Sequence, residues 1–125
     1  MPRVLIVDDD PAFLELLSNE LNYYGYSATK ATNGSDAIDI YKEIDFDLVI
    51  TDFQMPGING LVVAHEIRQI CFSQNRKLVN IILLSSECPD KIKVQMESSN
   101  DIDFIAPKLF GLEALKVYIK NSRYS

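Results

Sequence analysis

Five short apolar runs, each followed by a stretch with helical periodicity, limit this chain to a small number of folds. The runs lie at residues 4–7, 26–31, 48–51, 79–84 and 102–106. Helices are expected where apolar side chains recur every three or four positions, at residues 11–24, 35–44, 60–72, 90–98 and 112–119. Strands that alternate with helices form a parallel sheet through right-handed crossovers, and the helices cover both faces. The sequence therefore predicts a doubly wound α/β domain, (βα)5, with a five-stranded parallel sheet.

The size and charge of the chain argue against several classes of protein. Its 125 residues suit one domain spanning residues 1–125, with no output domain. The net charge of −6 argues against direct binding of nucleic acid, which needs a basic surface. No apolar stretch approaches the ~20 residues of a membrane span, and the N-terminus lacks a signal-peptide pattern. Cys71 and Cys88 lack metal-site spacing, so we expect reduced thiols in a cytoplasmic protein without a membrane partner.

Acidic side chains stand at the carboxyl ends of two predicted strands. Asp8 and Asp9 follow the first strand, and Asp52 follows the third, just before a turn that Pro56 and Gly57 impose. Ligands of open parallel sheets bind outside these ends, so the carboxylates are expected to converge. Carboxylates about 4 Å apart repel by roughly 4 kcal/mol at an effective dielectric near 20, which a cation with hard oxygen ligands, such as Mg²⁺, would offset. The cluster therefore indicates a divalent cation and phosphate chemistry.

Two further polar residues are expected at the same edge of the sheet. Ser85 ends the fourth strand and Lys108 follows the fifth. Each residue has an ordinary alternative: Asp10 is expected to cap the first helix in part, Asp52 could cap the turn at residues 57–60, and Ser85 and Lys108 could be plain surface residues. The conjunction of acids, a hydroxyl and an ammonium at four strand ends favours a functional site.

Two segments carry a specific resemblance to a known family. One is Val-Leu-Ile-Val-Asp-Asp-Asp-Pro at residues 4–11, and the other is Asp-Leu-Val-Ile-Thr-Asp-Phe-Gln-Met-Pro-Gly-Ile-Asn-Gly at residues 47–60. With the turn at Asn33 and Gly34, they make the chain similar to the receiver domains of two-component response regulators from residue 4 to about residue 119. This family contains the chemotaxis regulator CheY. The resemblance implies the flavodoxin-like, CheY-like fold with strand order 2-1-3-4-5.

The resemblance also implies a phosphoacceptor and a Mg²⁺ site. Asp52 matches the phosphoacceptor aspartate of the family. Asp8 and Asp9 match the Mg²⁺-binding pair, with Asp9 as a direct ligand and Asp8 acting partly through water. Asp52 and the backbone carbonyl of Gln54 match the remaining protein ligands.

Other site residues are assigned by the same resemblance. Ser85 matches the switch hydroxyl that contacts the phosphoryl group, and Lys108 matches the lysine that pairs with a phosphoryl oxygen. Gln54 and Glu87 occupy the positions that tune attack by water, and they are expected to set the lifetime of the phosphorylated state. Ile105 stands where the family often has a switching tyrosine or phenylalanine.

The sequence departs from the family pattern after the fifth strand. The family usually has a lysine followed by proline, with a cis bond between them, whereas this chain has Pro107, Lys108, Leu109 and Phe110. Phe110 matches the usual aromatic residue two positions after the lysine. The Lys108–Leu109 bond is expected to be either trans in a rearranged loop or strained, because a cis bond before a residue other than proline costs roughly 3 kcal/mol. A second alignment would put Pro107 at the lysine position and weaken the site.

The function that the resemblance implies is signalling. The chain would not be an enzyme in the usual sense, although it would assist its own phosphorylation and dephosphorylation. A histidine kinase or histidine phosphotransfer protein would donate the phosphoryl group, and a protein target would bind the phosphorylated state, with the chain as a monomer or a phosphorylation-dependent homodimer. The alternative is a pseudo-receiver that acts as an adaptor or dimerisation module without phosphorylation. A nucleotide-binding enzyme is disfavoured, because the chain has neither a G-x-G-x-x-G nor a Walker A sequence.

Overall fold

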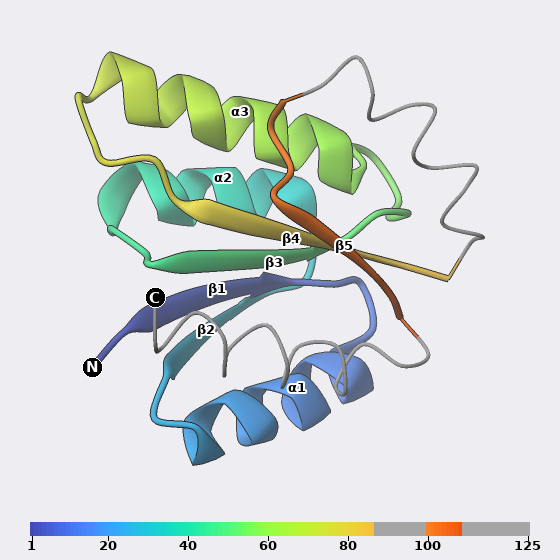
Figure 1. Cartoon of the computed structure of the whole chain (residues 1–125). Coiled ribbons are helices and arrows are strands. Elements are labelled where there is room, and N and C mark those ends of the chain that lie inside the picture. Colours follow the sequence, from blue (N-terminus) through green and yellow to red (C-terminus); the bar gives the residue numbers. More distant parts are fainter. Residues whose placement is uncertain (87–99, 109–125) are drawn as a thin grey trace.

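The computed structural model describes residues 1–86 and 100–108. Its elements are, in order, β1 (Arg3–Val7), α1 (Pro11–Tyr23), β2 (Ser27–Ala31), α2 (Gly34–Glu43), β3 (Leu48–Asp52), α3 (Gly60–Ser73), β4 (Asn80–Ser85) and β5 (Phe104–Pro107). Neighbouring strands pair in parallel in the order β2-β1-β3-β4-β5 (Figure 1). The predicted doubly wound α/β fold with strand order 2-1-3-4-5 is confirmed. The helices expected at residues 90–98 and 112–119 lie outside the described residues.

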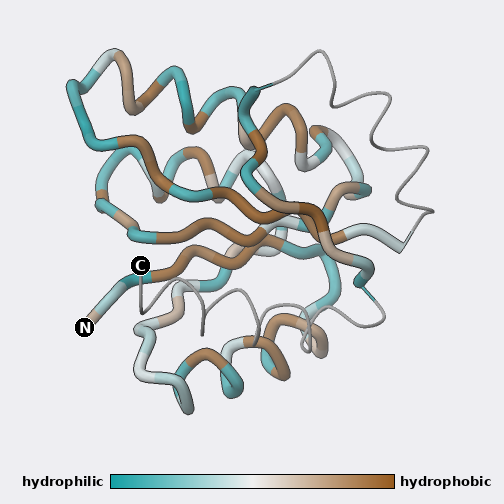
Figure 2. The backbone as a smooth tube through the Cα atoms, viewed as in Figure 1, coloured by the Kyte–Doolittle hydropathy of each residue, from teal (hydrophilic) through white to brown (hydrophobic). Residues whose placement is uncertain are grey.

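Helices cover both faces of the sheet. Helices α2 and α3 lie on one face and α1 lies on the other (Figure 1). Alternate side chains of the same strand enter the two cores: Leu5 packs with α2 and α3, whereas Val4 and Ile6 pack with the leucines of α1. The middle parts of the central strands are therefore apolar, as the brown stretches in Figure 2 show, which is typical of parallel strands buried on both faces.

Each described helix begins at a polar cap. The side chains of Asp10, Asn33 and Asn59 accept backbone N–H groups of the first turns of α1, α2 and α3. These caps satisfy donors that have no partner within the helix. The capping role expected for Asp10 is thus confirmed. Within the described ranges, no helix combines the length and the apolar composition that a membrane crossing requires.

The last strand begins later than the sequence predicts. The expected run was 102–106, but β5 spans Phe104–Pro107. Asp103, just before this strand, contacts β4 through both its backbone and its side chain: its N–H donates to the carbonyl of Ile81 at 2.9 Å, and its Oδ2 accepts the Ile81 N–H at 2.7 Å. Pro107 can end this strand because it sits at the last paired position, opposite Ser85, where a missing N–H costs little.

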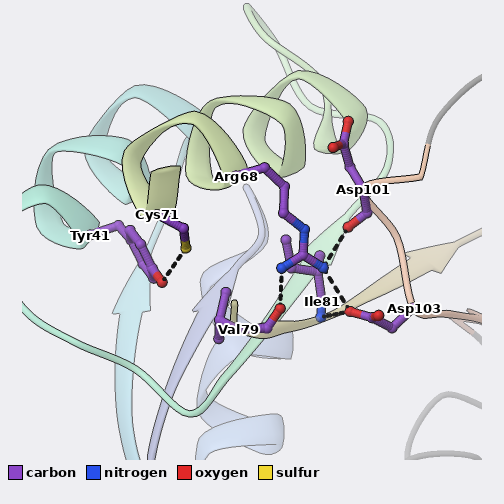
Figure 3. Close-up of polar contacts among 7 residues, drawn as sticks. All are labelled: Tyr41, Arg68, Cys71, Val79, Ile81, Asp101 and Asp103. Atoms are coloured by element: carbon purple, nitrogen blue, oxygen red, sulfur yellow. Dashed lines mark hydrogen bonds and ion pairs between the residues drawn. The ribbon is translucent and has the colours of Figure 1, made fainter. Parts of the chain in front are cut away.

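Arg68 on α3 ties the segment before β5 to the sheet (Figure 3). Its guanidinium is buried, with 7% of the residue exposed. It donates to the carbonyl oxygens of Val79 and Asp101, the latter at 3.0 Å, and pairs with the Asp103 carboxylate at 2.8 Å. Because β5 leads directly to Lys108, this network helps to fix where Lys108 emerges from the sheet.

Replacing Arg68 with methionine should lower the free energy of unfolding by about 2–4 kcal/mol. The variant removes a buried cation, so the Val79 and Asp101 carbonyl oxygens lose its N–H donors and the Asp103 carboxylate keeps the Ile81 N–H but loses its ion pair. Urea unfolding followed by circular dichroism measures the change. His65→Gln is the matched control, since His65 also contacts this segment, at 3.3 Å from Asp101, but its side chain is 58% exposed. That control should lose less than about 1 kcal/mol. Equal losses in the two variants would contradict a clamping role for Arg68.

Candidate functional site

Three predicted acids converge at the carboxyl ends of β1 and β3. One carboxylate oxygen from each of Asp8, Asp9 and Asp52 lies within 4.8 Å of the others. Asp8 and Asp52 are buried, at 2% and 6% exposure, whereas Asp9 is exposed. The convergence expected from the strand ends is therefore present.

Asp8 is held by the start of α1. Its backbone N–H donates to the carbonyl of Ala31 at the end of β2, at 3.1 Å. Its Oδ1 accepts the N–H of Asp10 at 2.9 Å, and Asp10 in turn caps α1. One carboxylate oxygen of Asp8 is thus committed to the loop, and only Oδ2 is available to the site.

Asp52 is held by a tight return of the chain after β3. The N–H of the next residue, Phe53, donates to the carbonyl of Leu84 at 2.8 Å, and the N–H of Gly60 donates to the carbonyl of Phe53 at 2.8 Å. Gly57 adopts φ 85°, a backbone conformation that favours glycine. The loop therefore folds back so that α3 begins directly against the end of β3.

Lys108 brings an ammonium group between the two buried acids. Its Nζ lies 2.8 Å from Asp8 Oδ2 and 3.5 Å from Asp52 Oδ2. Its backbone N–H donates to the carbonyl of Ser85 at 2.7 Å. This position agrees with the alignment that matches Lys108 to the family lysine and disagrees with the alternative that puts Pro107 there. The Lys108–Leu109 bond involves a residue outside the described part of the chain.

Charge in this site is not balanced. Burial, together with the negative charge of Asp8, raises the pKa of Asp52 to about 6 against the opposing effect of Lys108. Burial also raises the pKa of Asp8, although its hydrogen bonds with Lys108 and with the N–H of Asp10 act in the other direction. Burial alone would lower the pKa of Lys108, but the two carboxylates outweigh it and raise that pKa. Two buried carboxylates therefore share the positive charge of one ammonium group.

The remaining predicted residues lie around this centre. Ser85 is buried at the last position of β4, opposite Pro107. Gln54 is exposed two residues after Asp52. Ile105 lies in β5, partly buried, in a small apolar cluster near Leu83. Glu87 lies outside the described residues.

Sequence reasoning missed one residue that contacts the site. The ring of Phe13, in the first turn of α1, has its centroid 4.9 Å from Lys108 Nζ. An aromatic residue four positions after Asp9 was the only signal in the sequence. Whether Phe13 contacts the site depends on where Lys108 lies, and only the tertiary structure gives that position.

The sequence model of the response regulator receiver domain family matches residues 4–120. This chain belongs to that family. The match covers nearly the whole chain and includes every strand that carries a site residue. The receiver resemblance carried by residues 4–11 and 47–60 is confirmed.

Named relatives agree with this membership. The virulence sensor protein BvgS of Bordetella bronchiseptica is 47% identical over 66 residues, which is 53% of this chain and 5% of BvgS. The uncharacterized transcriptional regulatory protein YkoG of Bacillus subtilis is 31% identical over 118 residues, 94% of this chain and 49% of YkoG. The chain therefore spans about half the length of YkoG, and the segment that matches BvgS is a small part of that protein.

A solved response regulator structure is similar to this chain over nearly its whole length. The response regulator TrrA of Thermotoga maritima, in complex with Mg²⁺-BeF, is 37% identical to this receiver with a TM-score of 0.77. The match covers 97% of this chain and 98% of TrrA. TrrA also appears in a complex with the histidine kinase ThkA, with a TM-score of 0.79 and coverage of 97% of each chain.

The acidic cluster fits a Mg²⁺ site. Its donors are all hard carboxylate oxygens, which Mg²⁺ prefers. Apart from the ion pair with Lys108, the buried Oδ2 of Asp8 has no hydrogen-bond partner among the described residues. A divalent cation would give Asp8 Oδ2 a partner and add positive charge among the carboxylates.

Without divalent cations, the receiver should become more stable as the pH falls from about 7 to about 5. The pKa of Asp52 is about 6 in the folded protein, above its ordinary value of 3.8, so proton uptake favours the folded state. This stabilisation is complete below the lower value and is lost as the pH rises through about 6. Asp52→Asn should therefore gain about 1–2 kcal/mol at pH 7 and show a weaker pH dependence.

Urea unfolding in EDTA between about pH 5 and pH 7.5 measures this effect. Asp39→Asn, at an exposed position of α2, is the matched control and should retain the wild-type pH dependence. A wild-type stability that is constant across this range would contradict the raised pKa of Asp52.

Proposed function

We propose that this receiver accepts a phosphoryl group on Asp52 in a Mg²⁺-dependent reaction and signals through phosphorylation-dependent protein–protein interaction. The observation that carries the proposal is the placement of Lys108 Nζ between two buried carboxylates, 2.8 Å from Asp8 and 3.5 Å from Asp52. A lysine in a structural ion pair needs only one acidic partner. Transfer of a phosphoryl group needs a nucleophilic carboxylate with positive charge close to it.

The reaction follows from the residues present. A carboxylate oxygen of Asp52 attacks the phosphorus of a phosphohistidine, the N–P bond breaks, and the imidazole leaves while an acyl phosphate forms. Asp8, Asp9, Asp52 and the backbone carbonyl of Gln54 would hold the Mg²⁺. The bound ion would neutralise the phosphoryl oxygens. Lys108 supplies a second, fixed positive charge from β5.

Other residues would couple the phosphoryl group to the rest of the domain. Ser85 offers a hydroxyl at the end of β4, where it would donate to a phosphoryl oxygen. Gln54 and Glu87 would tune the approach of water, and so the lifetime of the acyl phosphate. Ile105 would take the place of the switching aromatic residue. The added charge would bias the domain between two conformations.

The proposed phosphodonor is a histidine kinase or a histidine phosphotransfer protein. The TrrA complex with ThkA supports a kinase as partner, and the TrrA complex with Mg²⁺-BeF supports a metal-dependent phosphoryl site. We further propose that residues 1–125 act as one receiver domain in the cytoplasm, without direct binding to nucleic acid. In this role the receiver acts as a monomer or as a phosphorylation-dependent homodimer.

Intact-mass spectrometry after incubation with acetyl phosphate tests the phosphoacceptor. We expect one labile phosphoryl adduct that requires Mg²⁺, disappears in EDTA and is absent from Asp52→Asn. The exposed Asp39→Asn variant is the control for loss of one acid and should form the adduct normally. An adduct that persists in Asp52→Asn would assign the chemistry elsewhere. No adduct with either acetyl phosphate or a phosphorylated kinase would favour the pseudo-receiver.

A further inference from the structure

The ring of Phe13 forms part of the environment of Lys108. Phe13 is partly buried and packs against the apolar core beneath α1. Its ring centroid lies 4.9 Å from Lys108 Nζ. The Asp10 cap fixes the start of α1, and this helix therefore holds the Phe13 ring in a defined position. An ammonium over an aromatic face is attracted by the negative charge density of the ring.

Lys108 and a divalent cation would compete for the same oxygen. The closest contact of Nζ is Asp8 Oδ2, at 2.8 Å, while Asp52 Oδ2 is more distant at 3.5 Å. The other oxygen of Asp8 is occupied by the N–H of Asp10. A cation bound to Asp8 would therefore take the oxygen that Lys108 contacts most closely, and the ammonium would lose its best partner.

We propose that Phe13 is a positioning residue for Lys108. When a divalent cation occupies Asp8, the ring face holds the ammonium at the site, so that it remains directed toward Asp52 and the group transferred there. The inference rests on the proposed function, because it concerns the cationic partner of the phosphoryl group. It assigns to α1 a role that the matched motifs do not contain.

The chemistry of the ring suits this role. A third carboxylate in its place would compete with the phosphoryl group for the ammonium, whereas a ring face attracts positive charge without accepting all of its N–H groups. Lysine has a long, flexible stem that loses considerable freedom when its end is fixed. A ring that restricts the stem beforehand reduces the freedom lost when the phosphoryl group binds.

Binding of beryllofluoride in the presence of Mg²⁺ tests the inference by calorimetry. Phe13→Leu should weaken beryllofluoride binding about three- to tenfold, whereas Phe13→Tyr, which keeps the ring face, should bind like the wild type. The affinity for Mg²⁺ alone should not fall in Phe13→Leu, because the ring contacts the ammonium without the metal and, in this proposal, also with it, so that loss of the ring favours neither state. Tyr23→Leu removes an aromatic residue that is 83% exposed near the end of α1 and should change neither affinity. A merely structural role would weaken Mg²⁺ and beryllofluoride binding together.

A second measurement separates failure of this inference from failure of the proposed function. The ε-methylene protons of Lys108 should show an upfield ring-current shift in NMR spectra of the Mg²⁺-bound wild type, and Phe13→Leu should remove it. If the wild type binds no beryllofluoride, the proposed phosphoryl site is wrong. The ring-current shift of Lys108 still shows whether Phe13 contacts the ammonium group. If the wild type binds beryllofluoride and Phe13→Leu binds it equally well, the positioning role of Phe13 is wrong.

Discussion

Replacing Lys108 with methionine is expected to slow phosphorylation of Asp52 by about two orders of magnitude. Methionine keeps much of the apolar stem but removes the only described cation near the acids, which lies 2.8 Å from Asp8 and 3.5 Å from Asp52. A fixed charge directed at a reacting centre commonly contributes 10²- to 10³-fold to a rate. The rate of adduct formation with acetyl phosphate at saturating Mg²⁺, followed by intact mass, measures the loss.

The same variant should be unstable without metal. Its two buried carboxylates lose their shared partner, and the free energy of unfolding at pH 7 should fall by about 3 kcal/mol, as expected when one member of a buried ion pair is removed. Added Mg²⁺ should recover much of this loss. So should a lower pH, because the acids already have raised pKa values and protonation favours the folded state.

Lys30→Met is the matched control for loss of a lysine ion pair. Lys30 pairs with Glu15 at 2.8 Å, but both side chains are largely exposed, at 44% and 62%. This variant should change the free energy of unfolding by less than about 1 kcal/mol and leave the phosphorylation rate unchanged. A Lys108→Met protein that is phosphorylated at the wild-type rate would show that Lys108 is only a structural counter-ion.

The positions that the sequence predicts correctly are those that follow from strand ends. Asp8, Asp9 and Asp52 come directly after apolar runs, and parallel topology brings such positions together whatever the helices do. The placement of Lys108 required a choice between two alignments, because Pro107 and Leu109 break the usual pattern. The position of Nζ beside Asp8 agrees with the alignment based on the downstream aromatic residue.

The residues that sequence reasoning missed depend on contacts between distant elements. Arg68 and Asp103 are 35 residues apart, and each by itself looks like a surface charge. Both contribute to the network around the segment before β5, which begins at Phe104. Phe13 has the spacing of an ordinary core residue, and its contact with Lys108 becomes visible only when α1 and β5 are placed together. The local sequence pattern predicts the strands, whereas these side-chain contacts depend on how distant elements pack together.

Gly60→Ala should be among the most damaging single substitutions in this receiver. A Cβ at this position would lie 2.3 Å from the carbonyl oxygen of Asp52 and 2.7 Å from Cδ1 of Leu83. The first contact is with backbone and cannot be relieved by a rotamer change, so α3 must move away from β3. The hydrogen bond from the Gly60 N–H to Phe53 would then weaken. We expect the free energy of unfolding to fall by more than about 3 kcal/mol.

This substitution should also impair the site, because the clash lies on Asp52, the proposed phosphoacceptor. Displacement of a nucleophile by about 1 Å can reduce a rate 10²-fold, so the folded fraction of Gly60→Ala should be phosphorylated at least tenfold more slowly than wild type.

Gly25→Ala is the matched control. Gly25 has a φ of 89° but nothing within 4 Å of an added Cβ, so the variant meets backbone strain without a clash. It should lose about 1–2 kcal/mol and retain the wild-type phosphorylation rate. Urea unfolding and adduct formation, measured on both variants, separate the two effects. If Gly60→Ala lost no more stability than Gly25→Ala, the close approach of α3 to the end of β3 would not be what holds Asp52 in place.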